Sequence, residues 1–150
     1  MIPNINGQYL DPTYRLPGED LDAYVGHAVQ LSGTTVVPLS DTDQATTQTV
    51  FGLGVLRDSG SFANNRGVEI WTDGAIVEAI AGTNGVSAGD TVVPEYAASG
   101  TDRGRFVIAE TGDLTDGDFV WGTAQTDAAE DGKFTFLLNR RQVNLDGTGA

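Results

Sequence analysis

Short runs of apolar and β-branched residues, separated by turn residues, follow one another along the chain from about residue 23. This spacing is typical of β-strands, and no amphipathic helical stripe is present beyond a single turn at 19–23. The predicted strands lie at 23–31, 34–39, 49–58, 66–72, 75–81 and 133–139. Glycines and turn residues recur every 8–12 positions between them. We therefore expect an all-β fold, either a small antiparallel barrel or a sandwich.

Turn residues divide these strands. The three strongest turn signals are Asp73-Gly74, Asn84-Gly85 and Asp131-Gly132. The first pair separates 66–72 from 75–81, and a two-residue loop of this composition predicts a β-hairpin with a type I′ turn. The glycines inside 49–58 predict a β-bulge or a close approach of another chain segment.

Two stretches of the chain align without gaps at an offset of 28, residues 86–109 with residues 114–137. The identical pairs are Gly89/Gly117, Asp90/Asp118, Val92/Val120, Gly104/Gly132 and Phe106/Phe134, and Arg105 aligns with Lys133. Each copy reads as a Gly-Asp turn, a strand, a loop, and a Gly-basic-Phe triplet that opens a second strand. We expect two similar hairpins with the phenylalanines pointing inward, a repeat of packing units and not of active sites.

The chain divides into three parts. Residues 1–18 carry three prolines and are predicted to form an extended N-terminal arm, residues 19–145 a single β domain, and residues 146–150 a frayed tail. The arm is rich in apolar and aromatic side chains that need a surface, either the arm's own domain or a partner. Its candidate residues for an interface with a second subunit or another partner are Ile5, Tyr9, Leu10, Tyr14 and Leu16.

The composition excludes several kinds of metal site and argues against two classes of partner. The 150 residues contain no cysteine and one histidine, which excludes disulfides, thiolate metal sites and multi-histidine metal centres. The formal net charge is −13, so neither nucleic acid nor an anionic membrane is expected as a partner. Asp outnumbers Glu, and Lys133 is the only lysine. This balance favours adaptation to very salty water, and an acidic mesophilic domain is the alternative.

Candidate chemistry is sparse. Calcium is the first ion that the acidic segment 111–118 suggests, but counting from Asp113 puts Thr115, Gly117 and Ala124 where an EF-hand needs ligands. The pair Asp41 and Asp43 likewise lacks a downstream glutamate. His27 has no nucleophile motif beside it, so a structural role is expected. We expect no metal, no cofactor and no catalytic residues.

Two glutamates form a candidate pair of carboxylates, Glu69 and Glu78. In the predicted hairpin Glu69 would face Glu78, with Trp71 on the same side, as in a glycosidase carboxylate pair. Like charges tolerated in high salt, or partners for an arginine of a neighbouring subunit, are the other interpretations. We expect no enzymatic activity, because a glycosidase needs a cleft with aromatic platforms and only Trp71 is near the pair.

A set of short motifs resembles the small capsid decoration (cement) proteins of tailed viruses. These motifs are GHAVQL (26–31), VVPLSDTD (36–43), FGLGVL (51–56), GVEIWTDGAIVEAIAG (67–82), VSAGDTVV (86–93), GRFVIAE (104–110) and GTAQTDA (122–128). The resemblance covers about 23–138 and rests on structural glycines and turns. A biotinyl-type barrel shares the GD-x-V turn but presents a lysine between methionines, and neither methionine flanks Lys133.

The resemblance implies a β domain on the outer capsid surface of the virion, bound to the major capsid protein as a homotrimer and stabilising the shell. Together with the acidic composition, it implies a virus of a halophilic archaeon. The alternative is an acidic carbohydrate- or surface-binding β module, for which Trp71 and Trp121 are the only tryptophan platforms.

Overall fold

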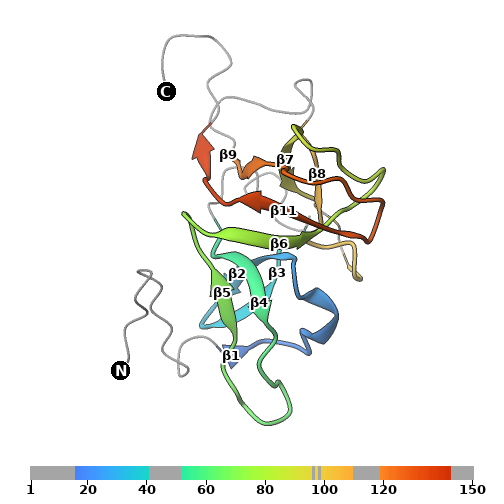
Figure 1. The fold of residues 1–150 in the computed structure, drawn as a ribbon. Helices are drawn as coiled ribbons and strands as arrows, with labels where there is room; N and C mark the ends of the chain where they lie inside the picture. Colours follow the sequence, from blue (N-terminus) through green and yellow to red (C-terminus); the bar gives the residue numbers. More distant parts are fainter. Residues whose placement is uncertain (1–15, 41–51, 96, 98, 110–118, 143–150) are drawn as a thin grey trace.

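The computed structural model describes residues 16–40, 52–95, 97, 99–109 and 119–142. Within these residues the chain is all-β, as predicted, and its only helical segment is a 3-10 turn at Asp22–Tyr24. The strands form several small sheets, and the described residues close no barrel, so the architecture is that of a sandwich (Figure 1). Residues 1–15 of the predicted arm, the loop 41–51, the acidic segment 110–118 and the tail 143–150 lie outside the described residues.

The N-terminal half forms a five-stranded sheet in the order β1-β3-β2-β4-β5. Its strands are β1 (Leu16–Pro17), β2 (Ala28–Ser32), β3 (Thr35–Pro38), β4 (Gly54–Asp58) and β5 (Glu69–Trp71). The hairpin of β2 and β3 confirms the break between the predicted strands 23–31 and 34–39, where Gly33 has a φ of 62°. By contrast, residues 23–27 do not extend the strand as predicted, because Tyr24 and His27 donate backbone hydrogen bonds into tight turns.

The described residues of the C-terminal half form three smaller sheets. Its strands are β6 (Ile76–Ile80), β7 (Thr91–Pro94), β8 (Phe106–Ile108), β9 (Phe119–Val120), β10 (Gly122–Thr123), β11 (Lys133–Leu137) and β12 (Arg141–Gln142). A three-stranded sheet has the order β10-β7-β8, β11 pairs with β6, and β12 pairs with β9. In Figure 1, β6 crosses the molecule between the five-stranded sheet and the other C-terminal strands.

Two hydrophobic clusters lie on opposite faces of the five-stranded sheet. Neighbouring residues of a strand point to opposite faces. Ala28 and Val55 accordingly join the larger cluster, while Val29 and Leu56 join the smaller one. The larger cluster packs the sheet against the C-terminal half around four buried aromatic side chains, Phe106, Trp121, Phe134 and Phe136. Leu21 and Tyr24, from the segment around the 3-10 turn, help form the smaller cluster.

The hairpin predicted at Asp73-Gly74 does not form. β5 pairs with β4, and β6 pairs with β11, so the turn carries the chain from one sheet to another. Only Gly74 of the pair has a positive φ, 98°, and the Ala75 amide donates to the Thr72 carbonyl. Positive φ at the second central residue alone is the pattern of a type II turn, whereas type I′ requires it at both. The prediction was wrong because Asp-Gly suits both turns.

Glycines in the segment 52–58 allow close packing, as the sequence predicted. A side chain at Gly54 would collide with the carbonyl oxygen of Trp71 on the neighbouring strand. The register between β4 and β5 also shifts between Leu56 and Asp58, which is the predicted irregularity. The first copy of the repeat likewise forms its hairpin, with β7 antiparallel to β8 and Phe106 buried.

The second copy of the repeat differs in register. Val92 pairs with Ile108 in the first copy, but Phe136, the equivalent of Ile108, pairs with Ala124 instead of Val120. β11 is shared between this contact and a longer ladder with β6. Phe134 is nevertheless buried like Phe106, so the inward direction of both phenylalanines is confirmed.

Candidate functional site

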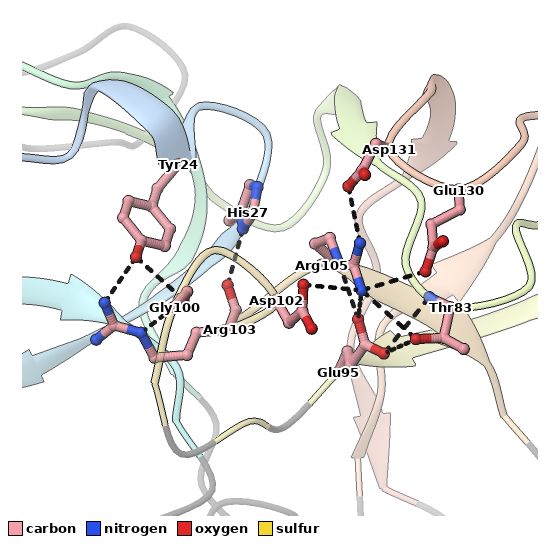
Figure 2. A network of polar contacts seen from close by, with 10 residues as sticks. All are labelled: Tyr24, His27, Thr83, Glu95, Gly100, Asp102, Arg103, Arg105, Glu130 and Asp131. Atoms are coloured by element: carbon pink, nitrogen blue, oxygen red, sulfur yellow. Dashed lines mark hydrogen bonds and ion pairs between the residues drawn. The ribbon is translucent and has the colours of Figure 1, made fainter.

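A buried arginine joins three loops of the C-terminal half (Figure 2). The side chain of Arg105, immediately before β8, is only 4% exposed. Its guanidinium contacts four carboxylates, those of Glu95, Asp102, Glu130 and Asp131, at nitrogen–oxygen distances of 2.8, 3.2, 3.6 and 2.7 Å. Glu95 also accepts a 2.5-Å hydrogen bond from the Thr83 hydroxyl. We call Arg105 and these four acids the Arg105 cluster.

Burial and the nearby charges have opposite effects on the pKa of Arg105. Desolvation alone would lower the pKa of Arg105, but its hydrogen bonds to Asp131 and Glu95 and the nearby negative charges outweigh burial and raise it. One guanidinium against four carboxylates leaves the cluster three charges negative. The outer acids are more than half exposed, so solvent and salt ions screen their mutual repulsion. The arrangement suits a structural role in which Arg105 holds the three loops together.

A second polar group lies beside the first and holds the only histidine (Figure 2). His27 is 3% exposed, and its Nδ1 lies 2.8 Å from the carbonyl oxygen of Arg103. A carbonyl only accepts, so Nδ1 carries the proton. Burial lowers the pKa of His27 below its ordinary value, against the effect of this hydrogen bond. Arg103 in turn binds Glu19 at 2.8 Å and the Tyr24 hydroxyl at 2.7 Å.

A third buried contact fixes the end of the described chain. The Arg140 side chain is 3% exposed and lies over the Trp121 ring, 4.9 Å from its centroid. Its Nη2 donates to Asp73 at 2.8 Å, and its backbone amide donates to the same carboxylate. Burial alone would raise the pKa of Asp73, but the hydrogen bonds and charge of Arg140 hold it below its usual value. Arg140 thereby anchors the turn at residues 72–75.

The structure separates the two glutamates that the sequence placed face to face. Glu69, on β5, lies 3.8 Å from Arg57, and Glu78, on β6, lies 3.3 Å from Lys133. Both carboxylates are more than half exposed. Because β5 and β6 belong to different sheets, Glu69 does not face Glu78, and the expectation of a facing pair is wrong.

The two tryptophans also have structural surroundings. Trp121 is 1% exposed and contacts Phe106 edge-on. Trp71 is half-buried, and the Arg57 guanidinium lies 4.6 Å from its ring centroid. A sugar stacking on that face of Trp71 would have to displace Arg57.

Of the predicted interface residues, only Leu16 is described. Leu16 is half-buried in β1 and aligns with Thr35 of β3, so the end of the predicted arm is an edge strand of its own domain. Ile5, Tyr9, Leu10 and Tyr14 lie outside the described residues, as do Asp41, Asp43 and Asp113. Among the residues that are described, no group of three or more acidic or histidine side chains is placed to hold a metal ion. No helix there is long and apolar enough to span a membrane.

The Arg105 cluster was not predicted from the sequence. Arg105 aligns with Lys133 in the repeat, but the acids around Arg105 come from two loops and form no motif. The local sequence carried no signal of this burial, because alternation points the neighbour of an inward phenylalanine outward, and Lys133 in the equivalent position is 70% exposed. Comparisons add no assignment, since no protein-family model matches the chain and no curated protein is a significant match.

Proposed function

We propose that this chain is a non-enzymatic structural protein of a virion, which binds the outer surface of the assembled capsid as an oligomer and stabilises the shell. The observation that carries the proposal is the packing role of glycines in the motifs that resemble decoration proteins. Gly54 and Gly104 both occupy positions where a side chain would strike a neighbouring backbone. Such motifs specify a scaffold, which is what a decoration protein requires.

The use made of the buried polar side chains supports the same proposal. His27, Arg105 and Arg140 are engaged in contacts that tie one loop or strand to another. Catalytic groups instead face a space that a substrate can enter. A domain held together in this way suits a protein that must keep its shape on a shell under internal pressure.

Binding of the protein to the capsid would then be multivalent. Weak contacts of each copy add up when an oligomer binds a repeating lattice. The resemblance implies a trimer and the major capsid protein as partner, with a haloarchaeal tailed virus as the source. High salt strengthens apolar contacts and screens the repulsion between chains of charge −13, so binding weakens when salt is diluted.

The test is binding to purified capsids that lack the protein, in molar salt, measured by co-sedimentation and by the temperature at which the shell releases its contents. We expect saturable binding and a higher release temperature. Absence of binding at saturating protein would overturn the proposal. Sugar binding by the free protein, with no binding to capsids, would favour the carbohydrate-binding alternative.

The predicted arm is tested by deleting residues 1–15, which keeps β1 and its pairing with β3. A finer variant replaces Ile5, Tyr9, Leu10 and Tyr14 with serine, and the matched control replaces the polar Asn4 and Gln8 with alanine. We expect the first two to lose occupancy on capsids and the control to keep it. Full occupancy of the deletion variant would remove the arm from the proposed contact.

A further inference from the structure

An exposed sheet face in the C-terminal half differs in charge from the rest of the chain. It is formed where β6 and β11 pair side by side (Figure 1). Alternation along the two strands sends one set of side chains into the core and the other set outward. The outward set is Ile76, Glu78, Ile80, Lys133, Thr135 and Leu137, and we call it the β6–β11 outer face.

One end of this face is apolar. Ile76 and Leu137 lie directly opposite each other in the ladder and are 61% and 43% exposed. Ile76 is the most exposed large hydrophobic side chain among the described residues. Two large apolar side chains side by side in water gain free energy from any partner that covers them.

The other end is electrically balanced. Glu78 and Lys133 lie 3.3 Å apart, and both side chains are well exposed. The whole chain has a formal charge of −13, so most approaches between two copies bring like charges together. The β6–β11 outer face carries one charge of each sign, including the only lysine of the protein.

We propose that the β6–β11 outer face binds a second copy of this chain, packed face to face about a two-fold axis. When that axis runs along the strands, β6 of one copy lies over β11 of the other. Ile76 then meets Leu137 of the second copy, and Glu78 lies near its Lys133. The face is self-complementary in both respects, as a two-fold contact requires.

The small size of the face sets the strength of the contact. Six side chains bury less than the ~800 Å² per partner of a stable interface, so association is weak and depends on concentration. A capsid lattice would supply the missing affinity by holding copies close together. The inference rests on the proposed function only for this added affinity, because the two-fold contact itself needs no capsid. A two-fold contact pairs single copies, and three such contacts pair two trimers when the two-fold axes cross the trimer axis.

The first experiment measures mass by light scattering against protein concentration, in molar salt. We expect the mass to rise with concentration to twice that of the smallest unit. The double variant Ile76→Asn/Leu137→Asn should weaken this doubling by more than about tenfold. The matched control is Leu31→Asn/Ile108→Asn, which changes a leucine and an isoleucine that are 42% and 41% exposed on other strands. It should associate like the wild type.

The second experiment uses charge and needs no apolar substitution. Glu78→Lys gives a face with two positive charges, and Lys133→Glu a face with two negative charges. Each variant alone should lose the doubling, and an equimolar mixture should regain it at the lowest salt at which both remain folded. An exposed ion pair contributes at most about 1 kcal/mol, so both variants keep the fold, which circular dichroism checks.

Several results would overturn the proposal. These are a wild-type mass that does not change with concentration, a doubling that survives the Ile76→Asn/Leu137→Asn change, a loss of doubling in the control, or no recovery on mixing the two charge variants. None of these measurements contains a capsid. Failure of the face therefore leaves capsid binding to be judged by its own assay, and failure of capsid binding leaves the face standing.

Discussion

The two Gly-basic-Phe triplets, residues 104–106 and 132–134, have nearly the same sequence but different surroundings. Phe106 and Phe134 are both buried, and their ring centroids lie 6.3 Å apart. The basic residues differ completely, since the Arg105 side chain is 4% exposed and that of Lys133 is 70% exposed. Local sequence sets the direction of the phenylalanine, whereas the loops that gather around each triplet decide what happens to the basic side chain.

The residue types match these two environments. A guanidinium has five donors in a planar fork, and Arg105 uses this geometry to contact carboxylates on several sides at once. An ammonium on a flexible stem suits the single exposed contact that Lys133 makes with Glu78. The first triplet therefore contributes to stability, and the second contributes to the surface.

The largest expected effect follows from removing each basic side chain. Arg105→Met leaves Glu95 largely buried with no cation, which should cost about 3–5 kcal/mol of unfolding free energy. Lys133→Met should cost less than about 1 kcal/mol, because its ion pair is exposed. Denaturant unfolding in molar salt measures both. Adding Glu95→Gln to Arg105→Met should recover part of the loss, and equal losses in the two single variants would contradict the comparison.

Substitution of the glycine should likewise destabilise the protein more in the first triplet than in the second. Gly104 has a φ of 77°, and a side chain there would collide with the Ala28 carbonyl oxygen. Gly132 lies outside the positive-φ region, and an added Cβ would come 2.9 Å from the Ala129 carbonyl oxygen. We expect Gly104→Ala to cost about 2–3 kcal/mol and Gly132→Ala about 1 kcal/mol. Thermal unfolding would contradict this if Gly132→Ala were the more damaging change.

Between pH 7 and pH 5 the two copies should differ in their pH dependence, because, among the described residues, only the first copy contacts the histidine of the chain. The loop of that copy holds His27 through the Arg103 carbonyl, and the pKa of His27 is lowered in the folded state. Below the unfolded pKa of about 6.5 the unfolded chain binds more protons, so stability falls as pH decreases toward the folded pKa. His27→Asn should flatten this loss, which is at most about 1.4 kcal/mol per pH unit. An unchanged slope between pH 7 and pH 5 would rule out His27 as its source.

The difference between the triplets also shows what the sequence could predict. Strand positions and the β2–β3 and β7–β8 hairpins follow from local alternation and turn residues, and the structure confirms them except at residues 23–27. The pairing of β6 with β11 does not, because partners more than 50 residues apart leave no local signal. The Arg105 cluster was not predicted for a different reason: its acids lie between 3 and 26 residues from Arg105, at no regular spacing that would bring them to one side chain. Asp73-Gly74 failed because one dipeptide fits two turn types.

The smallest expected effect concerns the surplus of acids around Arg105. Glu130 is the most distant of its four partners, at 3.6 Å, and its side chain is 52% exposed. Glu130→Gln removes one weak attraction to Arg105 and the repulsion from three other carboxylates. At about 0.1 M salt, where the screening length is about 10 Å, the variant should be more stable than the wild type by less than about 1 kcal/mol.

At about 1 M salt the screening length falls to about 3 Å, and the advantage of Glu130→Gln should vanish. The matched control is Glu78→Gln beside Lys133, where no surplus of acids exists, and it should be neutral or slightly destabilising at both concentrations. Thermal unfolding of the three proteins at the two salt concentrations makes the measurement. If Glu130→Gln destabilised the protein more at low salt than at high salt, the Arg105 cluster would be held by attraction to every acid. The surplus negative charge of the cluster could then not explain why the folded protein would be more stable at high salt.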